Sequence, residues 1–213
     1  MDRSGNKNTG GTLTVRRLIA GGFDTVSLFL LFMLLVFLLN LTPLSRTARG
    51  HLERCREIQQ RASEELGGDA EAVRQALSRD TEYREELFAA QLHNYLLQAA
   101  ACAAAEGILF LAVPLANSSR ATFGMLLTGT GVFDPSGWTW APPWKIIMRF
   151  LFILFLDSLL LYPWTGTLTF LLVPVLRIIQ LMLGKKGKTI IDHLTGTEIA
   201  ETAERDTAGI TEE

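Results

Sequence analysis

The sequence contains little cysteine and almost no net charge. Its two cysteines, Cys55 and Cys102, are too few for a disulfide scaffold, and we interpret them as unpaired thiols. The formal net charge is −2, which provides no basic field to attract a nucleic acid. The composition also excludes a collagen-like chain and a wholly disordered one.

Recognisable enzyme motifs are missing as well. The three histidines, His51, His93 and His193, are far apart in the sequence, and none has the spacing of metal ligands. The chain contains no phosphate-binding Walker loop, no serine nucleophile elbow and no dinucleotide fingerprint. We therefore expect no enzymatic activity, no cofactor and no bound metal.

Long uncharged runs are the main feature that the sequence does contain. Hydrophobic residues make up 48% of the chain and charged residues 20%. These averages conceal a segregated chain, because residues 45–90 are dense in arginine and glutamate while four other stretches are almost free of charge. The pattern predicts an all-α membrane protein with four transmembrane helices and an external helical insertion between the first and the second.

The first transmembrane helix is predicted over residues 16–44. From Leu18 to Leu44 the only charged residue is Asp24, and this run exceeds the ~20 residues that cross a bilayer. It is also too long for the apolar region of a signal peptide, which has ~7–15 residues. The other three transmembrane helices are predicted over residues 91–117, 144–163 and 164–184.

The remaining segments are predicted to lie outside the bilayer. Residues 1–15 form a flexible tail and residues 118–143 a Gly/Pro-rich connection with a short strand-like or interfacial piece. Residues 185–213 form a basic boundary followed by an acidic, disordered tail. Within the insertion at 45–90, Gly67-Gly68 separates two helices, and Asp69 is the expected N-cap of the second one.

The flanking charges predict the orientation in the membrane. Basic residues precede the first predicted transmembrane helix and follow the last one, and such clusters stay in the cytoplasm. Four helices return the chain to its starting side, so both termini are expected in the cytoplasm and residues 45–90 outside. The basic residues in question are Arg3, Lys7, Arg16, Arg17, Lys185, Lys186 and Lys188.

Five ionisable residues lie inside the predicted transmembrane helices: Asp24, Glu106, Arg149, Asp157 and Arg177. Each unpaired charge at mid-bilayer costs ~2.5–3.5 kcal/mol, so these residues should pair, line a wet cavity or be neutral. Depth along the helices predicts a cluster in the cytoplasmic half, with Asp157 apart from it.

Within this cluster we expect Asp24 to pair with Arg177. At the membrane boundary we expect Arg17 to pair with Asp192. Three interpretations of the charges remain open, namely ion pairs that fix helix register, a proton or cation pathway, and a lipid-headgroup site.

Four segments together resemble the RDD family of bacterial multi-pass membrane proteins. The first is the stretch from Arg16 to Asp24, with an arginine at the start of the helix and an aspartate seven residues after Arg17. The second is the stretch from Thr122 to Asp134. The third is Arg149 with Asp157, and the fourth is Gly187 to Thr197, which contains Asp192 and the closing Gly-Thr.

The resemblance covers about residues 16–44 and 118–199 and leaves out the block at 45–90, which we interpret as an insertion. Met125-Leu126 replaces a Lys-Arg pair of the family, and Thr195 replaces an alanine. The resemblance implies a multi-pass protein of the bacterial inner membrane. A few family members are linked to cation/proton exchange.

We therefore predict a small transporter in a lipid bilayer, as a homo-oligomer or part of a larger membrane complex. Asp24, Glu106 and Asp157 are the candidates for binding the ion or proton, and Arg17, Arg149, Arg177 and Asp192 are their charge partners. The alternative is a non-catalytic accessory or assembly subunit that binds a partner through residues 45–90.

Overall fold

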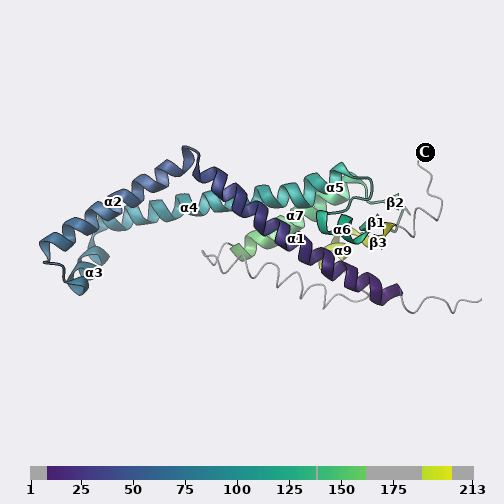
Figure 1. Ribbon diagram of the computed structural model, residues 1–213, viewed down its shortest axis with the longest axis horizontal. Helices are drawn as coiled ribbons and strands as arrows, with labels where there is room; N and C mark the ends of the chain where they lie inside the picture. Colours follow the sequence, from purple (N-terminus) through teal and green to yellow (C-terminus); the bar gives the residue numbers. More distant parts are fainter. Residues whose placement is uncertain (1–8, 138, 162–188, 203–213) are drawn as a thin grey trace, which may run out of the picture. The chain divides into compact units, whose positions relative to one another are not determined.

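The computed structural model describes residues 9–137, 139–161 and 189–202 (Figure 1). The chain divides into two compact units. One unit contains Met1–Leu31 with Ala103–Glu213, and the other contains Phe32–Cys102. The described residues are mostly helical. The predicted fourth transmembrane helix at 164–184 lies outside them.

Helix α1 (Thr9–Asn40) contains the first predicted transmembrane helix and begins earlier than expected, inside the segment that we predicted to be a flexible tail. Its buried positions are Arg17, Ala20, Asp24 and Leu28. Their spacing of three and four residues places them on one helix face. Many large apolar side chains on its other faces are exposed, from Val15 to Leu38. A soluble helix has the reverse arrangement, with its apolar side chains buried.

Residues 45–90 form a helical hairpin, and the predicted break between two helices is present. Helix α2 (Leu44–Glu65) ends at a turn in which Gly67 and Gly68 have φ of +64° and +80°, values that favour glycine. Helix α3 (Ala70–Arg79) begins at Asp69, whose side chain accepts from the Glu71 and Ala72 amides, so the predicted N-cap is confirmed. A small apolar core holds the hairpin together and contains Ile58, Val73 and Leu77, with Ala62 and Tyr83 packed against it.

Helix α4 (Thr81–Gly107) differs from the prediction, which began the second transmembrane helix at residue 91. The helix begins at Thr81 and continues without a break into that segment. A π-helical turn, η1 (Ile108–Ala112), and a short helix, α5 (Val113–Ala116), complete it. Pro114 lacks the N–H that would bond to the carbonyl four residues earlier, which accounts for the irregular turn just before it.

A small antiparallel sheet is the main difference from the predicted all-α fold. Strand β1 (Thr130–Asp134) lies between β2 (Thr139–Trp140) and β3 (Glu198–Glu201), with Phe133 opposite Trp140 and Val132 opposite Ile199. The strand-like piece predicted within 118–143 is confirmed. The prediction that the tail after Thr197 is disordered is wrong for residues 198–201, because β3 hydrogen-bonds to β1 along its whole length.

Three helices of this unit are connected directly to the strands of the sheet (Figure 1). Helix α6 (Phe123–Thr128) precedes β1, α7 (Pro143–Leu161) follows β2, and α9 (Ile190–Thr195) precedes β3. Val132, Ala141 and Ile146 form the local apolar core. This arrangement brings the beginning of α7 and the end of α9 to the same sheet.

Two helical stretches of the described residues are long and apolar enough to cross a membrane, Leu13–Asn40 and Thr81–Ala116. Their most apolar windows are 11% and 33% buried, so most of the apolar side chains in these windows are not covered by the rest of the described chain. Helix α7 is long enough but carries three charged residues, Lys145, Arg149 and Asp157.

Candidate functional site

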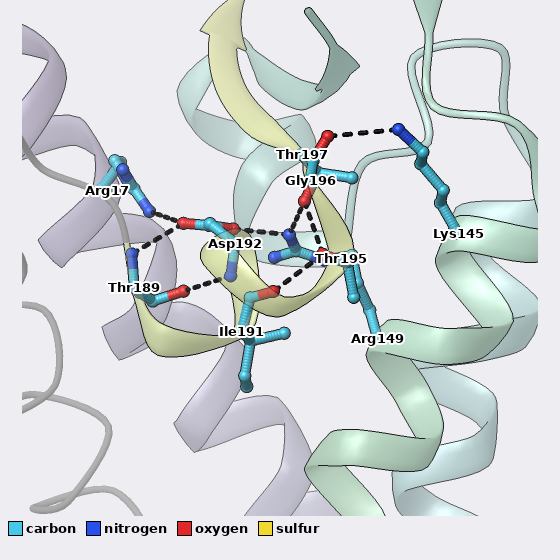
Figure 2. A network of polar contacts seen from close by, with 9 residues as sticks. All are labelled: Arg17, Lys145, Arg149, Thr189, Ile191, Asp192, Thr195, Gly196 and Thr197. Atoms are coloured by element: carbon cyan, nitrogen blue, oxygen red, sulfur yellow. Dashed lines mark hydrogen bonds and ion pairs between the residues drawn. The ribbon is translucent and has the colours of Figure 1, made fainter. Parts of the chain in front are cut away.

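The most buried polar group of the site is the carboxylate of Asp192, which is 1% exposed (Figure 2). Arg17 of α1 donates to its Oδ2 atom at 2.7 Å, and Arg149 of α7 donates to its Oδ1 atom at 2.5 Å. The predicted pair between Arg17 and Asp192 is therefore present. Asp192 joins three elements, α1, α7 and α9, through charge-assisted hydrogen bonds.

The local sequence around Asp192 explains why its side chain lies in this position. Thr189 and Asp192 form a capping box at the start of α9, in which the Thr189 hydroxyl accepts from the Asp192 amide at 3.2 Å. In return, Asp192 Oδ2 accepts from the Thr189 amide at 2.9 Å. Gly196, with φ +60°, ends the helix one turn later. The carboxylate that caps α9 is therefore the one that holds the two arginines.

These contacts set the ionisation of Asp192. Burial opposes ionisation, but the charges of Arg149 and Arg17, together with the Thr189 amide, outweigh it and lower the pKa of Asp192 to about 2. The group is therefore a carboxylate at neutral pH. Two cations face this one anion, and in the described part of the chain the Nε–H of Arg17 has no acceptor.

Two further contacts join α7 to the segment that follows α9 (Figure 2). Arg149 also donates to the Thr197 hydroxyl at 2.5 Å, and Lys145 donates to the Gly196 carbonyl at 3.2 Å. Lys145 in addition forms an ion pair with Asp134 at 2.8 Å. Hydrogen bonds from Lys145 and from Ser136 lower the pKa of Asp134 to about 2.

Asp24 lies on α1, seven residues after Arg17 in the sequence, and contacts the start of α6. Its Oδ2 atom accepts from the Thr122 hydroxyl at 2.6 Å, and its Oδ1 atom accepts from the Gly124 amide at 2.7 Å. Thr122 is also the N-cap of α6. Gly124 packs so tightly on α1 that a Cβ atom there would lie 2.1 Å from the Ala20 carbonyl oxygen. A side chain at position 124 would push α6 away from Asp24.

A cavity of about 100 Å³ adjoins Asp24. Most of its wall is apolar and includes Phe110 and Pro114 from the region of the π-helical turn. Three charged residues, Asp24, Arg120 and Arg149, contribute to its polar lining together with Thr122. A volume of this size accommodates a few water molecules. Asp24 and Arg149 thus line the same cavity, although they hydrogen-bond to different partners.

The other predicted site residues have different outcomes. Glu106 is 1% exposed inside the first unit, on the segment of α4 that contains the small buried residues Ala101 and Ala105. Asp157 belongs to α7, and its side chain is not among those described. Arg177 lies outside the described residues, and so does the predicted Asp24–Arg177 pair.

Sequence reasoning missed Lys145 and gave Asp134 no role. A signal was available, because Lys145 and Arg149 are four residues apart and therefore share one face of α7. Two cations on one face of an apolar helix require two anions, and Asp134 and Asp192 are those anions. Arg120, which lines the cavity, has φ of +53°, and no feature of the sequence indicated this conformation.

The four motif segments of the sequence meet in this unit. Asp24 of the first contacts Thr122 and Gly124 of the second, and Arg17 of the first binds Asp192 of the fourth. Arg149 of the third binds Asp192 and Thr197. Comparisons with models of protein families, with curated proteins and with solved structures find no match to this chain.

Proposed function

We propose that the protein is a four-helix integral membrane protein of the bacterial inner membrane, with both termini in the cytoplasm and residues 45–90 outside. The exposed apolar side chains of α1 support this proposal, because bilayer lipid is the solvent in which such a surface is stable. The buried stripe of α1, with its arginine and aspartate, fits a helix whose charges face the protein interior.

Membership of the RDD family is part of the same proposal. It rests on the convergence of the four motif segments, which are distant in the sequence and yet contact one another: Arg17 and Arg149 donate to Asp192, and Thr122 donates to Asp24. If the motifs matched only by chance, their residues would not be expected to contact one another in the fold. The hairpin at 45–90, with its own apolar core, agrees with an insertion into such a framework.

Within this framework the protein is a small transporter that exchanges a monovalent cation for protons, and it works as a homo-oligomer or within a larger membrane complex. The observation that carries the proposal is the cavity beside Asp24. A carboxylate that borders a cavity in a membrane protein can bind a cation or exchange a proton. Asp24 is the carrier, and Glu106 is the second acidic group at membrane depth.

A flux measurement tests this proposal. Purified protein in liposomes that contain a pH-sensitive dye should change the internal pH when a Na⁺ or K⁺ gradient is imposed. Asp24→Asn should reduce this flux to the level of empty liposomes. The substitution removes the charge but preserves the contacts, since the Asn oxygen can accept from the Gly124 amide and its NH₂ group can donate to Thr122.

Asp69→Asn is the matched control, because asparagine caps a helix as well as aspartate does and the residue is exposed in the other unit. This variant should transport like the wild type. A wild-type protein without cation-dependent flux, or an Asp24→Asn variant with full flux, would contradict the transporter proposal.

The second candidate function is that of an accessory or assembly subunit. The hydrogen bonds of Asp192 favour it. A buried carboxylate that accepts hydrogen bonds from two arginines and a backbone amide holds helices together and moves no ion. The hairpin at 45–90 is then the element that binds a partner. Absence of flux together with stable insertion into membranes would select this function.

A further inference from the structure

Two histidines that are distant in the sequence lie side by side in the second unit. His51 of α2 and His93 of α4 have ring centroids 5.4 Å apart, with an angle of 34° between the ring planes. No feature of the sequence associates them. Both side chains are partly exposed, so an ion in solution can reach them.

The hydrogen bonds of the two rings determine which nitrogen carries the proton. His93 Nδ1 lies 2.9 Å from the Ala89 carbonyl oxygen, and a carbonyl only accepts, so Nδ1 is the protonated nitrogen. His51 Nδ1 lies 2.5 Å from Glu86, which also accepts from Arg54 at 3.0 Å and is therefore a carboxylate. His51 Nδ1 is the donor in this pair for the same reason.

When a ring is neutral, its lone pair is consequently on Nε2. Among the described residues, no side chain or backbone group donates a hydrogen bond to either Nε2 atom. Two neighbouring imidazoles that present free lone pairs, each oriented through Nδ1 by a carboxylate or a backbone carbonyl, have the arrangement of metal-ligating histidines.

We propose that His51 and His93 form a binding site for a divalent transition-metal ion of the Zn²⁺, Ni²⁺ or Cu²⁺ class, with Glu86 as the residue that positions His51. Imidazole nitrogen suits these ions, and rings this close can both reach one ion at about 2.0–2.1 Å from each nitrogen. No third histidine, cysteine or carboxylate joins them in the part of the chain that the structure describes. Water completes the coordination, so the ion is exchangeable.

An ion bound at this site would link α2 to α4. These helices belong to one hairpin, and their other polar contacts near the histidines are the bonds of Glu86 to His51 and Arg54 and the weak thiol contact of Cys55 with the Tyr83 carbonyl. A metal ion held by one side chain from each helix therefore stabilises the hairpin. Ligand binding to the folded state raises the melting temperature.

Calorimetric titration of the full-length protein in detergent with Zn²⁺, under reducing conditions, tests the site. The wild type should bind one ion per chain, and His51→Gln and His93→Gln should each weaken binding at least tenfold. Glutamine keeps a donor for Glu86 or Ala89 but provides no imidazole nitrogen. Glu86→Gln should weaken binding ~10–100-fold, as loss of an orienting carboxylate does. His193→Gln is the matched control and should bind like the wild type.

A second readout needs no substitution in the site. Co²⁺ added to the wild type should give visible absorption bands of a nitrogen-ligated ion, which Zn²⁺ then displaces, and the same bands should appear in His193→Gln. Absence of Zn²⁺ binding and of these bands in the wild type would overturn the proposal. Binding that survives both His51→Gln and His93→Gln would also overturn it.

Discussion

At the scale of single residues, Asp192 accepts hydrogen bonds from two arginines that belong to different helices. Neither arginine has an alternative anion at comparable distance among the described residues. Removal of the carboxylate therefore leaves two buried positive charges near each other. The energetic importance of Asp192 lies in this uncompensated charge more than in any single bond.

Asp192→Asn should lower the free energy of unfolding in detergent by about 3–5 kcal/mol, the usual loss when one member of a buried pair is removed. The substitution keeps an acceptor for the Thr189 amide, so it isolates the charge. The double variant Arg17→Gln/Asp192→Asn should lose less than the sum of the two single variants. Strict additivity in a chemical-unfolding experiment would mean that the pair does not interact.

Arg16→Gln is the control for this measurement. Arg16 forms an ion pair with Glu201 at 3.0 Å, but its side chain is 44% exposed. Exposed pairs contribute about 0–1 kcal/mol. This adjacent arginine of the same helix should therefore be nearly neutral.

The pKa of Asp192 also predicts a pH dependence of stability. An aspartate in the unfolded chain has a pKa of ~3.9, and the pKa in the folded protein is about 2. A group with a lowered pKa stabilises the fold above the unfolded value, and this stabilisation is lost as the pH falls towards the folded value. The melting temperature should thus drop as the pH falls from about 4 to about 2.

Asp192→Asn should show a smaller drop over this range, measured by thermal melts of both proteins in the same buffers. Part of the drop should remain in the variant, because Asp134 has a similarly lowered pKa and is still present. Identical acid profiles of the two proteins would contradict the assignment.

At the scale of elements, α1 packs on its neighbours through one narrow face, which contains its buried residues. Helix α6 contacts this face at Gly124. The amide of Gly124 reaches Asp24 only because no side chain separates the two backbones. Small residues permit the same kind of close approach between helices in membranes.

Gly124→Ala should destabilise the protein by about 1–3 kcal/mol, the range for overpacking a tight contact. The added methyl group would meet the Ala20 carbonyl, which is backbone and cannot move aside. Gly22→Ala is the matched control on α1, since nothing lies within 4 Å of its Cβ position. Because alanine favours helix, that variant should be neutral or slightly more stable in the same thermal melt. Equal effects of the two substitutions would refute the close approach.

Sequence reasoning predicted the elements whose signals are local. The turn at Gly67-Gly68 and the cap at Asp69 depend on a few adjacent residues, and both were found. The Arg17–Asp192 pair followed from the positions of the two residues at the ends of apolar runs. The sheet was missed because its strands are short and β3 pairs with a segment about seventy residues earlier, a long-range pairing that local patterns do not indicate.

The candidate site was predictable to a similar degree. The membrane-depth argument identified Asp24, Glu106 and Arg149 as interior charges and placed Asp192 at the membrane boundary. It could not assign the Thr122 and Gly124 partners of Asp24, because these come from a connection rather than from a helix of known depth. The proximity of His51 and His93 depends on the crossing of two helices in the hairpin. Residue spacing alone carries no information on that crossing.

At the scale of the whole molecule, the two apolar stretches of the described residues that are long enough to cross a membrane connect the two units. Helix α1 leaves the first unit near Leu31, and α4 enters it near Ala103. The second unit therefore lies between these stretches in the chain. In a membrane-spanning protein with cytoplasmic termini, the charged hairpin of this unit is on the external side.

Thiol labelling of intact cells tests this central claim most directly. In a background with Cys55→Ser and Cys102→Ser, a membrane-impermeant maleimide should label Gln59→Cys, an exposed position of α2, from outside. It should label Thr207→Cys only after the cells are lysed. Labelling of Thr207→Cys in intact cells while Gln59→Cys stays protected, or labelling of both, would contradict the account.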